Sequence, residues 1–195
     1  MLQLVVRKST LAEERDWWTE AFTLEERAAI EDAFQPLGNI SAESLGRSNN
    51  PNIIGNLVGH LKREDLRHLG YRLLERADSL IDASVPILDL HFYLSARGNF
   101  FYRWRQLDPF AFQESIESYQ QQIGLASNAV IVFRENKTWG FIPGHAGYRQ
   151  LRIIEEKRGN FTLARALCLQ AKSEGWADDW DHQIARIDKK LAKGD

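Results

Sequence analysis

The sequence contains one cysteine, Cys168, and only five prolines among 195 residues. A single cysteine excludes an internal disulfide, so the fold depends on non-covalent packing. The chain has no run of about 18 apolar residues, which excludes a membrane-spanning helix of ordinary length. The apolar stretch 1–6 is short, is followed rather than preceded by basic residues and lacks a small-residue cleavage site, so we expect no secretion signal. These absences predict a cytoplasmic protein.

An excess of charge of either sign is also absent. The 25 basic and 27 acidic residues give a net charge of −2 and are closely mixed along the chain. Nucleic acid and anionic membranes are therefore not expected partners, because no overall field attracts them. Hydrophobic residues make up 44% of the chain, as in ordinary folded proteins. A chain of this length is expected to bury roughly 70% of its unfolded surface, in one domain or in a short run of stacked helical units.

The short motifs of metal and nucleotide sites are missing as well. No two of the five histidines are three or four residues apart, and HExxH, CxxC and a glycine-rich phosphate loop do not occur. Cys168 lies in the segment 144–175, whose resemblance to a known repeat, given below, implies a buried position, where thiols are usually inert. Asp178, Asp179 and Asp181 could hold a cation, but capping of a helix explains them better. We predict no metal, no cofactor and no catalytic residue, and hence a protein that is not an enzyme.

The N-terminal region, residues 1–50, is predicted to hold two short helices and a loop. Thr10 with Glu13, and Thr23 with Glu26, form possible capping boxes, which predict helices over about 10–20 and 24–35. Pro36 and Gly38 are expected to end the second helix. The stretch 38–50 is rich in Ser, Asn and Gly and is predicted to be a loop.

The central region is predicted to be helical throughout. Apolar residues three or four apart, with a polar break at 62–65, predict a helical hairpin over 51–81. Residues 86–107 carry apolar side chains on every side, which indicates a central helix. From Pro109 an apolar stripe continues to Phe133 and favours helix over 127–135, although the β-branched run and Gly124 are also compatible with a short strand. Residues 136–144 are expected to connect to the next helix.

The segment 144–175 resembles one tetratricopeptide repeat. The residues that occupy the motif positions are Tyr148, Leu151, Gly159, Phe161, Ala164, Cys168 and Ala171. The glycine permits a tight reversal between two helices, and the alanines permit their close approach. Arg152 and Trp176 depart from the pattern. Earlier segments match weakly: Gly70, Ser115 and Ala164 are equivalent positions only with spacings of 45 and 49 residues, against 34 in regular arrays.

The chain ending carries two further indications. Residues 178–192 form an amphipathic stripe with acidic residues at the start and Lys189 and Lys190 at the end, as the helix dipole favours, and would cap a solenoid. The segment 145–180 also resembles the C-terminal region of bacterial proteins without an assigned activity. The predicted fold is therefore all-α: an α-solenoid-like stack of antiparallel helical hairpins over 51–195 with a C-terminal capping helix, packed with residues 1–50 as a single domain.

The resemblance implies a scaffold that binds a protein or peptide on a concave surface. That surface is formed by the first helix of each hairpin. In the last hairpin it would present Arg149, Ile153, Glu156 and Lys157. In the middle hairpin it would present Asn99, Arg103 and Gln106. Non-catalytic binding of an unidentified partner is therefore the leading hypothesis.

Polar residues inside the apolar helix 86–107 leave alternatives open. His91, Asn99, Tyr102 and Arg103 are either satisfied within the core or line a groove, because buried polar groups need partners. An enzyme or small-molecule sensor with a pocket at His91, Tyr102 and Arg103 is the alternative function. The aromatic and basic run 100–105 would suit RNA only if its arginines shared one face. Six tryptophans and ten phenylalanines leave room for a surface patch that supports a homodimer.

Overall fold

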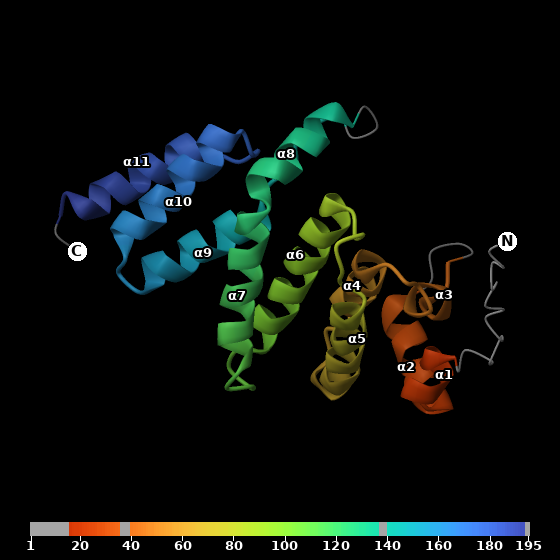
Figure 1. Cartoon of the computed structure of the whole chain (residues 1–195). Coiled ribbons are helices and arrows are strands. Elements are labelled where there is room, and N and C mark those ends of the chain that lie inside the picture. The colour runs from red at the N-terminus through yellow and green to blue at the C-terminus, as the bar shows by residue number, and fades with distance from the viewer. Residues whose placement is uncertain (1–15, 36–39, 137–139, 194–195) are drawn as a thin grey trace, which may run out of the picture.

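The computed structural model describes residues 16–35, 40–136 and 140–193, and these residues form helices and no strand (Figure 1). The all-α prediction is confirmed. The α-helices are α1 (Trp17–Ala21), α2 (Leu24–Phe34), α3 (Ala42–Gly46), α4 (Pro51–His60), α5 (Arg67–Ser79), α6 (Ile87–Trp104), α7 (Ala111–Gly124), α8 (Ala126–Glu135), α9 (Ala146–Lys157), α10 (Phe161–Glu174) and α11 (Trp180–Leu191). A single 3-10 turn, η1 (Glu64–Leu66), precedes α5. No helix in the described part of the chain is long and apolar enough to cross a bilayer.

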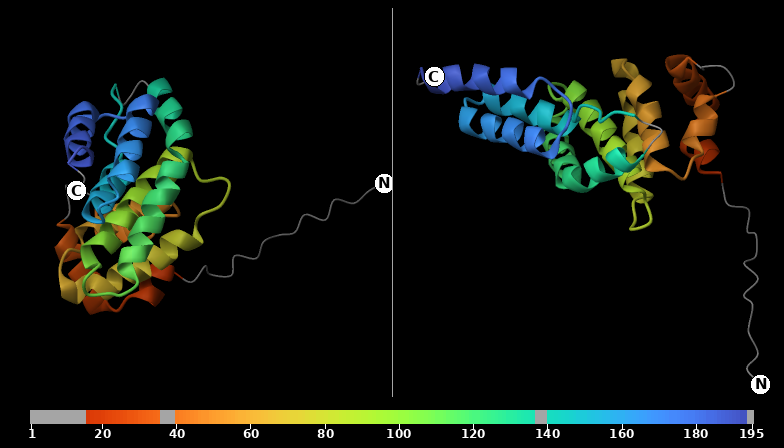
Figure 2. Two further views of the ribbon diagram at one scale, coloured as in Figure 1. Left: turned by 90° about the vertical axis from the view of Figure 1, so that its left-hand side faces the viewer. Right: turned by 90° about the horizontal axis from the view of Figure 1, so that it is seen from above.

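The helices follow one another along an elongated body, with α1 to α3 at one end and α11 at the other (Figures 1 and 2). Helix α4 packs against α5 and α6, and α6 packs against α7. Helix α7 packs against α9, which in turn packs against α10, and α10 packs against α11. Helix α8 extends beyond α7 and contacts α6 and α10. Helices α9 and α11 therefore lie at the C-terminal end of the body, far from α1 to α3.

The helix start predicted at Thr23 is confirmed in atomic detail. The amide of Glu26 donates to Oγ1 of Thr23 at 3.2 Å, and the amide of Thr23 donates to Oε2 of Glu26 at 2.8 Å. This reciprocal pair satisfies two amides that the first turn leaves unpaired. Helix α2 ends at Phe34, and Gln35 has a φ of 51°. The box at Thr10 and the predicted stop at 36–38 lie outside the described residues.

The prediction of a loop over 38–50 is wrong in part, because α3 forms within it. Ser41 caps this helix by accepting a hydrogen bond from the amide of Ser44 at 3.1 Å. The carboxylate of Glu31, from α2, accepts a hydrogen bond from the amide of Ala42 at 2.7 Å. The second contact depends on tertiary packing, which composition alone does not reveal.

The two helices predicted between 51 and 81 are α4 and α5, and the helix predicted over 86–107 is α6. Residues 127–135 lie within α8, so the helical interpretation is confirmed there and the strand is excluded. The stripe from Pro109 to Phe133 is not one helix, however. It divides at Leu125, whose amide donates to the carbonyl of Gln122 at 3.2 Å in a tightened turn. The low helix propensity of Gly124 accounts for a break at this point.

The core consists of two large clusters joined by a small one. The N-terminal cluster is built on α1 to α6 and includes Trp18, Phe22 and Tyr93. The C-terminal cluster is built on α8 to α11 and includes Tyr148 and Trp180. The third cluster connects α7 to α9. Its buried members are Ile116, Tyr119, Leu151 and Ile154. Burial of this apolar area is the main stabilising contribution.

Residues 146–174 fold as two helices joined by a tight turn. Gly159 has a φ of 77°, which residues with a side chain rarely adopt, and the amide of Asn160 donates to the carbonyl of Glu155 at 2.8 Å. Ala164, Cys168 and Ala171 are fully buried where α10 meets its neighbours. Asp179 caps α11 by accepting a hydrogen bond from the amide of His182 at 3.3 Å. The capping interpretation of this aspartate is therefore confirmed.

Candidate functional site

A shallow depression of about 410 Å³ lies between α9 and α11. Its lining from α9 is Arg152, Ile153, Glu156 and Lys157, and its lining from α11 is Arg186 and Lys190. Residues four apart on a helix share a face, so 152 and 156, 153 and 157, and 186 and 190 each present neighbouring side chains. We call this set of six residues the α9–α11 depression. It contains three of the four residues predicted to face a groove in this part of the chain.

The floor of the depression is an ion cluster around Glu156. Its carboxylate accepts two hydrogen bonds from Arg186, each at 2.6 Å, and one from Nη1 of Arg152 at 2.6 Å. Nζ of Lys190 lies 3.8 Å from Oε2. The side chain of Glu156 is only 9% exposed. Burial alone would raise the pKa of Glu156, but the hydrogen bonds from Arg186 and Arg152 outweigh it and lower the pKa. The carboxylate is therefore held in its charged form.

Two arginines of this cluster have restricted side chains. Arg186 also hydrogen-bonds Oε1 of Gln183 at 3.0 Å from Nη2, so its guanidinium is held in place from two sides. Arg152 is 8% exposed, and its Nε has no hydrogen-bond partner among the described residues. Sequence reasoning missed both as site residues. Arg152 carried a signal, since it replaces the small residue that the tetratricopeptide pattern prefers, whereas Arg186 lies beyond that motif.

The remaining predicted groove residues lie elsewhere. Arg149 pairs with Asp178, with Nε 3.0 Å from Oδ2, and does not line the depression. Asn99, on α6, accepts a hydrogen bond from the hydroxyl of Tyr119 at 2.9 Å. Arg103 points toward α4, where its Nη1 lies 3.5 Å from the carbonyl oxygen of Leu61. Gln106 is exposed in the turn after α6. These four do not join Ile153, Glu156 and Lys157 in one surface hollow.

A second polar cluster is buried where α6, α7 and the start of α9 meet. The imidazoles of His91 and His145 have centroids 4.9 Å apart at an interplanar angle of 81°. The indole of Trp176 stacks on His91, with centroids 5.2 Å apart, and meets His145 edge-on at 4.7 Å. Gln122 joins the elements, because its Oε1 accepts from the amide of Gly147 at 2.8 Å and its Nε2 donates to the carbonyl of His91 at 3.1 Å.

These hydrogen bonds fix the tautomers of both histidines. Nε2 of Gln122 lies 3.3 Å from Nε2 of His91, which must accept, so the proton of His91 is on Nδ1. Nδ1 of His145 accepts from the amide of Tyr148 at 3.3 Å, so the proton of His145 is on Nε2. Neither N–H finds an acceptor within the described ranges. Burial lowers the pKa of His91 to about 4. Burial, and then the charge of His91, lower the pKa of His145 to about 3.

The alternative pocket at His91, Tyr102 and Arg103 is not assembled around one space. His91 faces the cluster with His145 and Trp176. Tyr102 lies 11 residues further along α6, which corresponds to about 16 Å along a helix axis. Its ring packs under the guanidinium of Arg105, with 4.1 Å between Cζ and the ring centroid. The three side chains thus contact different parts of the protein.

Comparison with protein-family models, characterised proteins and solved structures gives no match to this chain.

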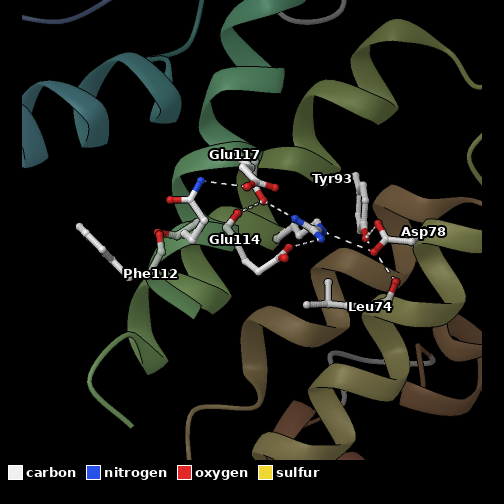
Figure 3. Close-up of polar contacts among 10 residues, drawn as sticks. Leu74, Asp78, Tyr93, Phe112, Glu114 and Glu117 are labelled. Atoms are coloured by element: carbon white, nitrogen blue, oxygen red, sulfur yellow. Dashed lines mark hydrogen bonds and ion pairs between the residues drawn. The ribbon is translucent and has the colours of Figure 1, made fainter. Parts of the chain in front are cut away.

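A third polar network joins α5, α6 and α7 around Arg97. Figure 3 shows three of its members, Asp78, Tyr93 and Glu114. Nη2 of Arg97 donates to Glu114 at 2.7 Å, Nη1 donates to Oγ of Ser118 at 2.6 Å, and Nε lies 3.4 Å from Asp78. Asp78 also accepts a hydrogen bond from the hydroxyl of Tyr93 at 2.5 Å. Burial would lower the pKa of Arg97, but the two carboxylates raise it. All three guanidinium nitrogens have a partner, on α5 or on α7. The network therefore holds α5, α6 and α7 in position.

Other candidates for chemistry are buried or dispersed. Burial raises the pKa of the Cys168 thiol, which has no exposed surface and is therefore a poor nucleophile. Among the residues that the structure describes, no group of three or more His, Cys, Asp or Glu side chains gathers as a metal site would require. Asp178 and Asp181 instead pair with Arg149 and Lys172.

Proposed function

We propose that the chain is a non-catalytic helical-repeat scaffold that binds a segment of a partner protein in the α9–α11 depression. In this proposal α4–α5, α6–α7 and α9–α10 are degenerate tetratricopeptide-like hairpins, and α11 is the cap that follows them. The observation that carries the proposal is that Ile153, Glu156 and Lys157, which the resemblance assigns to a binding surface, line one hollow together with two residues of α11.

Two further features support binding rather than chemistry. The depression is open and is lined by apolar and basic groups around a single carboxylate that is already hydrogen-bonded to two arginines. A general base must take up a proton, and the hydrogen bonds from Arg186 and Arg152, which lower the pKa of Glu156, oppose its protonation. The two arginines are held before any ligand arrives, which lowers the entropic cost of binding.

The experiment begins with selection of peptides of about 12 residues from a random library on the purified chain, with affinities then measured by fluorescence anisotropy. The test variant is Lys157→Glu with Lys190→Glu, because both lysines line the depression. The control is Lys189→Glu with Lys193→Glu, which makes the same change in charge at exposed positions outside the lining. We expect selected peptides to bind the wild type and the control alike and to lose affinity for the test variant by about tenfold or more. Peptides that bind all three proteins equally, or a selection that yields none, would contradict the proposal.

Arg149 is not used in this test. Its ion pair with Asp178 connects α9 to the segment before α11, so its replacement by glutamate would place two carboxylates together. A loss of binding in that variant would not distinguish a damaged surface from a displaced helix.

A further inference from the structure

Basic residues are concentrated in the C-terminal part of the chain. Residues 146–193 contain ten basic and seven acidic residues, whereas the rest of the chain contains 15 basic and 20 acidic residues. The overall charge of −2 therefore hides a positive region at one end of the elongated body. A local excess of positive charge can attract an anionic ligand even though the net charge of the whole chain is slightly negative.

The acidic residues of this region are mostly engaged one to one. The pairs are Glu155 with Arg158, Asp178 with Arg149, Asp181 with Lys172, and Asp188 with Arg165. Asp179 caps α11, and Glu174 accepts hydrogen bonds from Tyr148 and Trp176. None of these carboxylates lines the α9–α11 depression.

In the lining of the depression, basic residues outnumber acidic residues. Glu156 is its one carboxylate, and Arg152, Arg186, Lys190 and Lys157 are four cations in its lining. Three of these cations lie within 4 Å of Glu156, so a single negative charge is shared among them. Arg186 and Arg152 already hydrogen-bond Glu156, and Arg152 is only 8% exposed. The cations most open to a ligand are therefore Lys157, which is exposed, and Lys190, whose side chain is 41% exposed. Each lysine ammonium can donate hydrogen bonds to a carboxylate of a ligand. The cost in desolvation is small, because a lysine paired at the surface stays partly in water.

We propose that the segment bound in the α9–α11 depression is acidic: its carboxylates pair with Lys157 and Lys190, and an apolar residue contacts Ile153. This inference rests on the proposed function and names the chemical class of its ligand. An acidic protein segment suits the site better than nucleic acid does. The cations surround one short hollow with an apolar side chain, and no aromatic ring lines it to stack a base.

The test uses two synthetic peptides of about 12 residues that differ only in charge. One alternates glutamate and serine around a central leucine, and the other has glutamine in place of every glutamate. We expect the acidic peptide to bind at least about tenfold more tightly than the amide peptide and to weaken about tenfold between roughly 50 mM and 300 mM NaCl. Lys157→Glu with Lys190→Glu should lose about tenfold in affinity for the acidic peptide, and Lys189→Glu with Lys193→Glu should stay within about threefold.

The outcomes separate this inference from the proposed function. Equal binding of the two peptides, or equal loss in both double variants, would overturn the acidic ligand, because the attraction would then be absent or diffuse. A single-stranded oligonucleotide that binds the wild type more tightly than the acidic peptide would overturn it as well. If the library instead yields neutral or basic peptides that depend on Lys157 and Lys190, the scaffold function stands while the acidic ligand fails. If no peptide of any charge binds, both fail.

Discussion

The indole of Trp176 lies parallel to the imidazole of His91, with an interplanar angle of 2°. Trp176 stands at the turn between α10 and α11, whereas His91 stands in the first half of α6. The stack therefore connects the C-terminal helices directly to the centre of the body. His145 completes the contact from the start of α9. Charging either imidazole would place a cation in a site where each buried N–H already lacks an acceptor among the described residues.

Stability is expected to fall in mild acid because of these two histidines. Their pKa values drop on folding, from 6.5 to about 4 for His91 and about 3 for His145. The unfolded chain thus binds more protons than the folded chain between these values, so the free energy of unfolding decreases as the pH falls below 6.5. We expect one ring to contribute about 2 kcal/mol of this loss between pH 7 and pH 5. Urea unfolding followed by tryptophan fluorescence across that range measures it.

The matched variant for this prediction is His145→Asn. Asparagine retains an oxygen that can cap α9 but does not titrate, so the pH dependence should be clearly shallower even if the protein is less stable at neutral pH. His182→Gln removes an exposed histidine and should leave the slope unchanged. The explanation is wrong if His145→Asn loses stability between pH 7 and pH 5 as steeply as the wild type does.

The sequence predicts most helices but not every boundary. Apolar patterning and the Thr23–Glu26 box predict α2, α4 to α6 and α11, because these signals act within one or two turns. The same patterning predicts α7 and α8 as one continuous stripe. Helix α3 depends on a hydrogen bond from Ala42 to Glu31 of another helix, and the break at Leu125 depends on one tightened turn. Such features depend on tertiary packing or on a single residue. A periodic pattern of apolar residues over several turns does not contain that information.

The candidate site was predictable only where one helix carries it. Ile153, Glu156 and Lys157 lie three and four residues apart on α9, so one face of this helix brings all three to the depression. Arg186 joins them through the packing of α11 against the preceding helices, and no pattern in the sequence specifies that contact. His91 and His145 are 54 residues apart in the sequence, and their meeting depends on the positions of three helices. Long-range pairs of this kind require the tertiary structure.

Gly98→Ala is expected to destabilise the protein by about 2 kcal/mol, because α6 and α7 approach closely at this position. A Cβ at Gly98 would lie 2.5 Å from Cε1 of Tyr119, which is fully buried and unable to move aside. Gly59→Ala, in α4, is the control, since a Cβ there meets nothing within 4 Å. It should raise stability by up to about 1 kcal/mol through helix propensity. Thermal or urea unfolding compares them, and a neutral Gly98→Ala would show that the two helices are not packed this tightly.

Arg97→Met is expected to cost about 1–2 kcal/mol, because it leaves Ser118, Glu114 and Asp78 without their common donor. Methionine keeps most of the aliphatic volume, so the loss reports the polar contacts. Arg63→Met is the control: Arg63 forms an ion pair with Asp65 at 2.5 Å, shorter than the 2.7 Å between Arg97 and Glu114, but both side chains are well exposed. Its unfolding midpoint in urea should stay within error of the wild type. Equal effects of the two substitutions would mean that the Arg97 network does not hold α5, α6 and α7 together.

Cys168 provides a chemical probe of the contact between α9, α10 and α11. Its thiol is fully buried and burial raises its pKa, so a disulfide reagent should reach it only when these helices separate. We expect labelling of the native protein to be at least about a thousandfold slower than labelling in urea. The control moves the thiol by one residue: Leu169→Cys in a Cys168→Ala background places it about 100° around α10, at a position where leucine is 42% exposed. This variant should react at nearly the unfolded rate. Comparable rates for the two native proteins would mean that α10 is not covered on its Cys168 face, and the α9–α11 depression could not then be a preformed site.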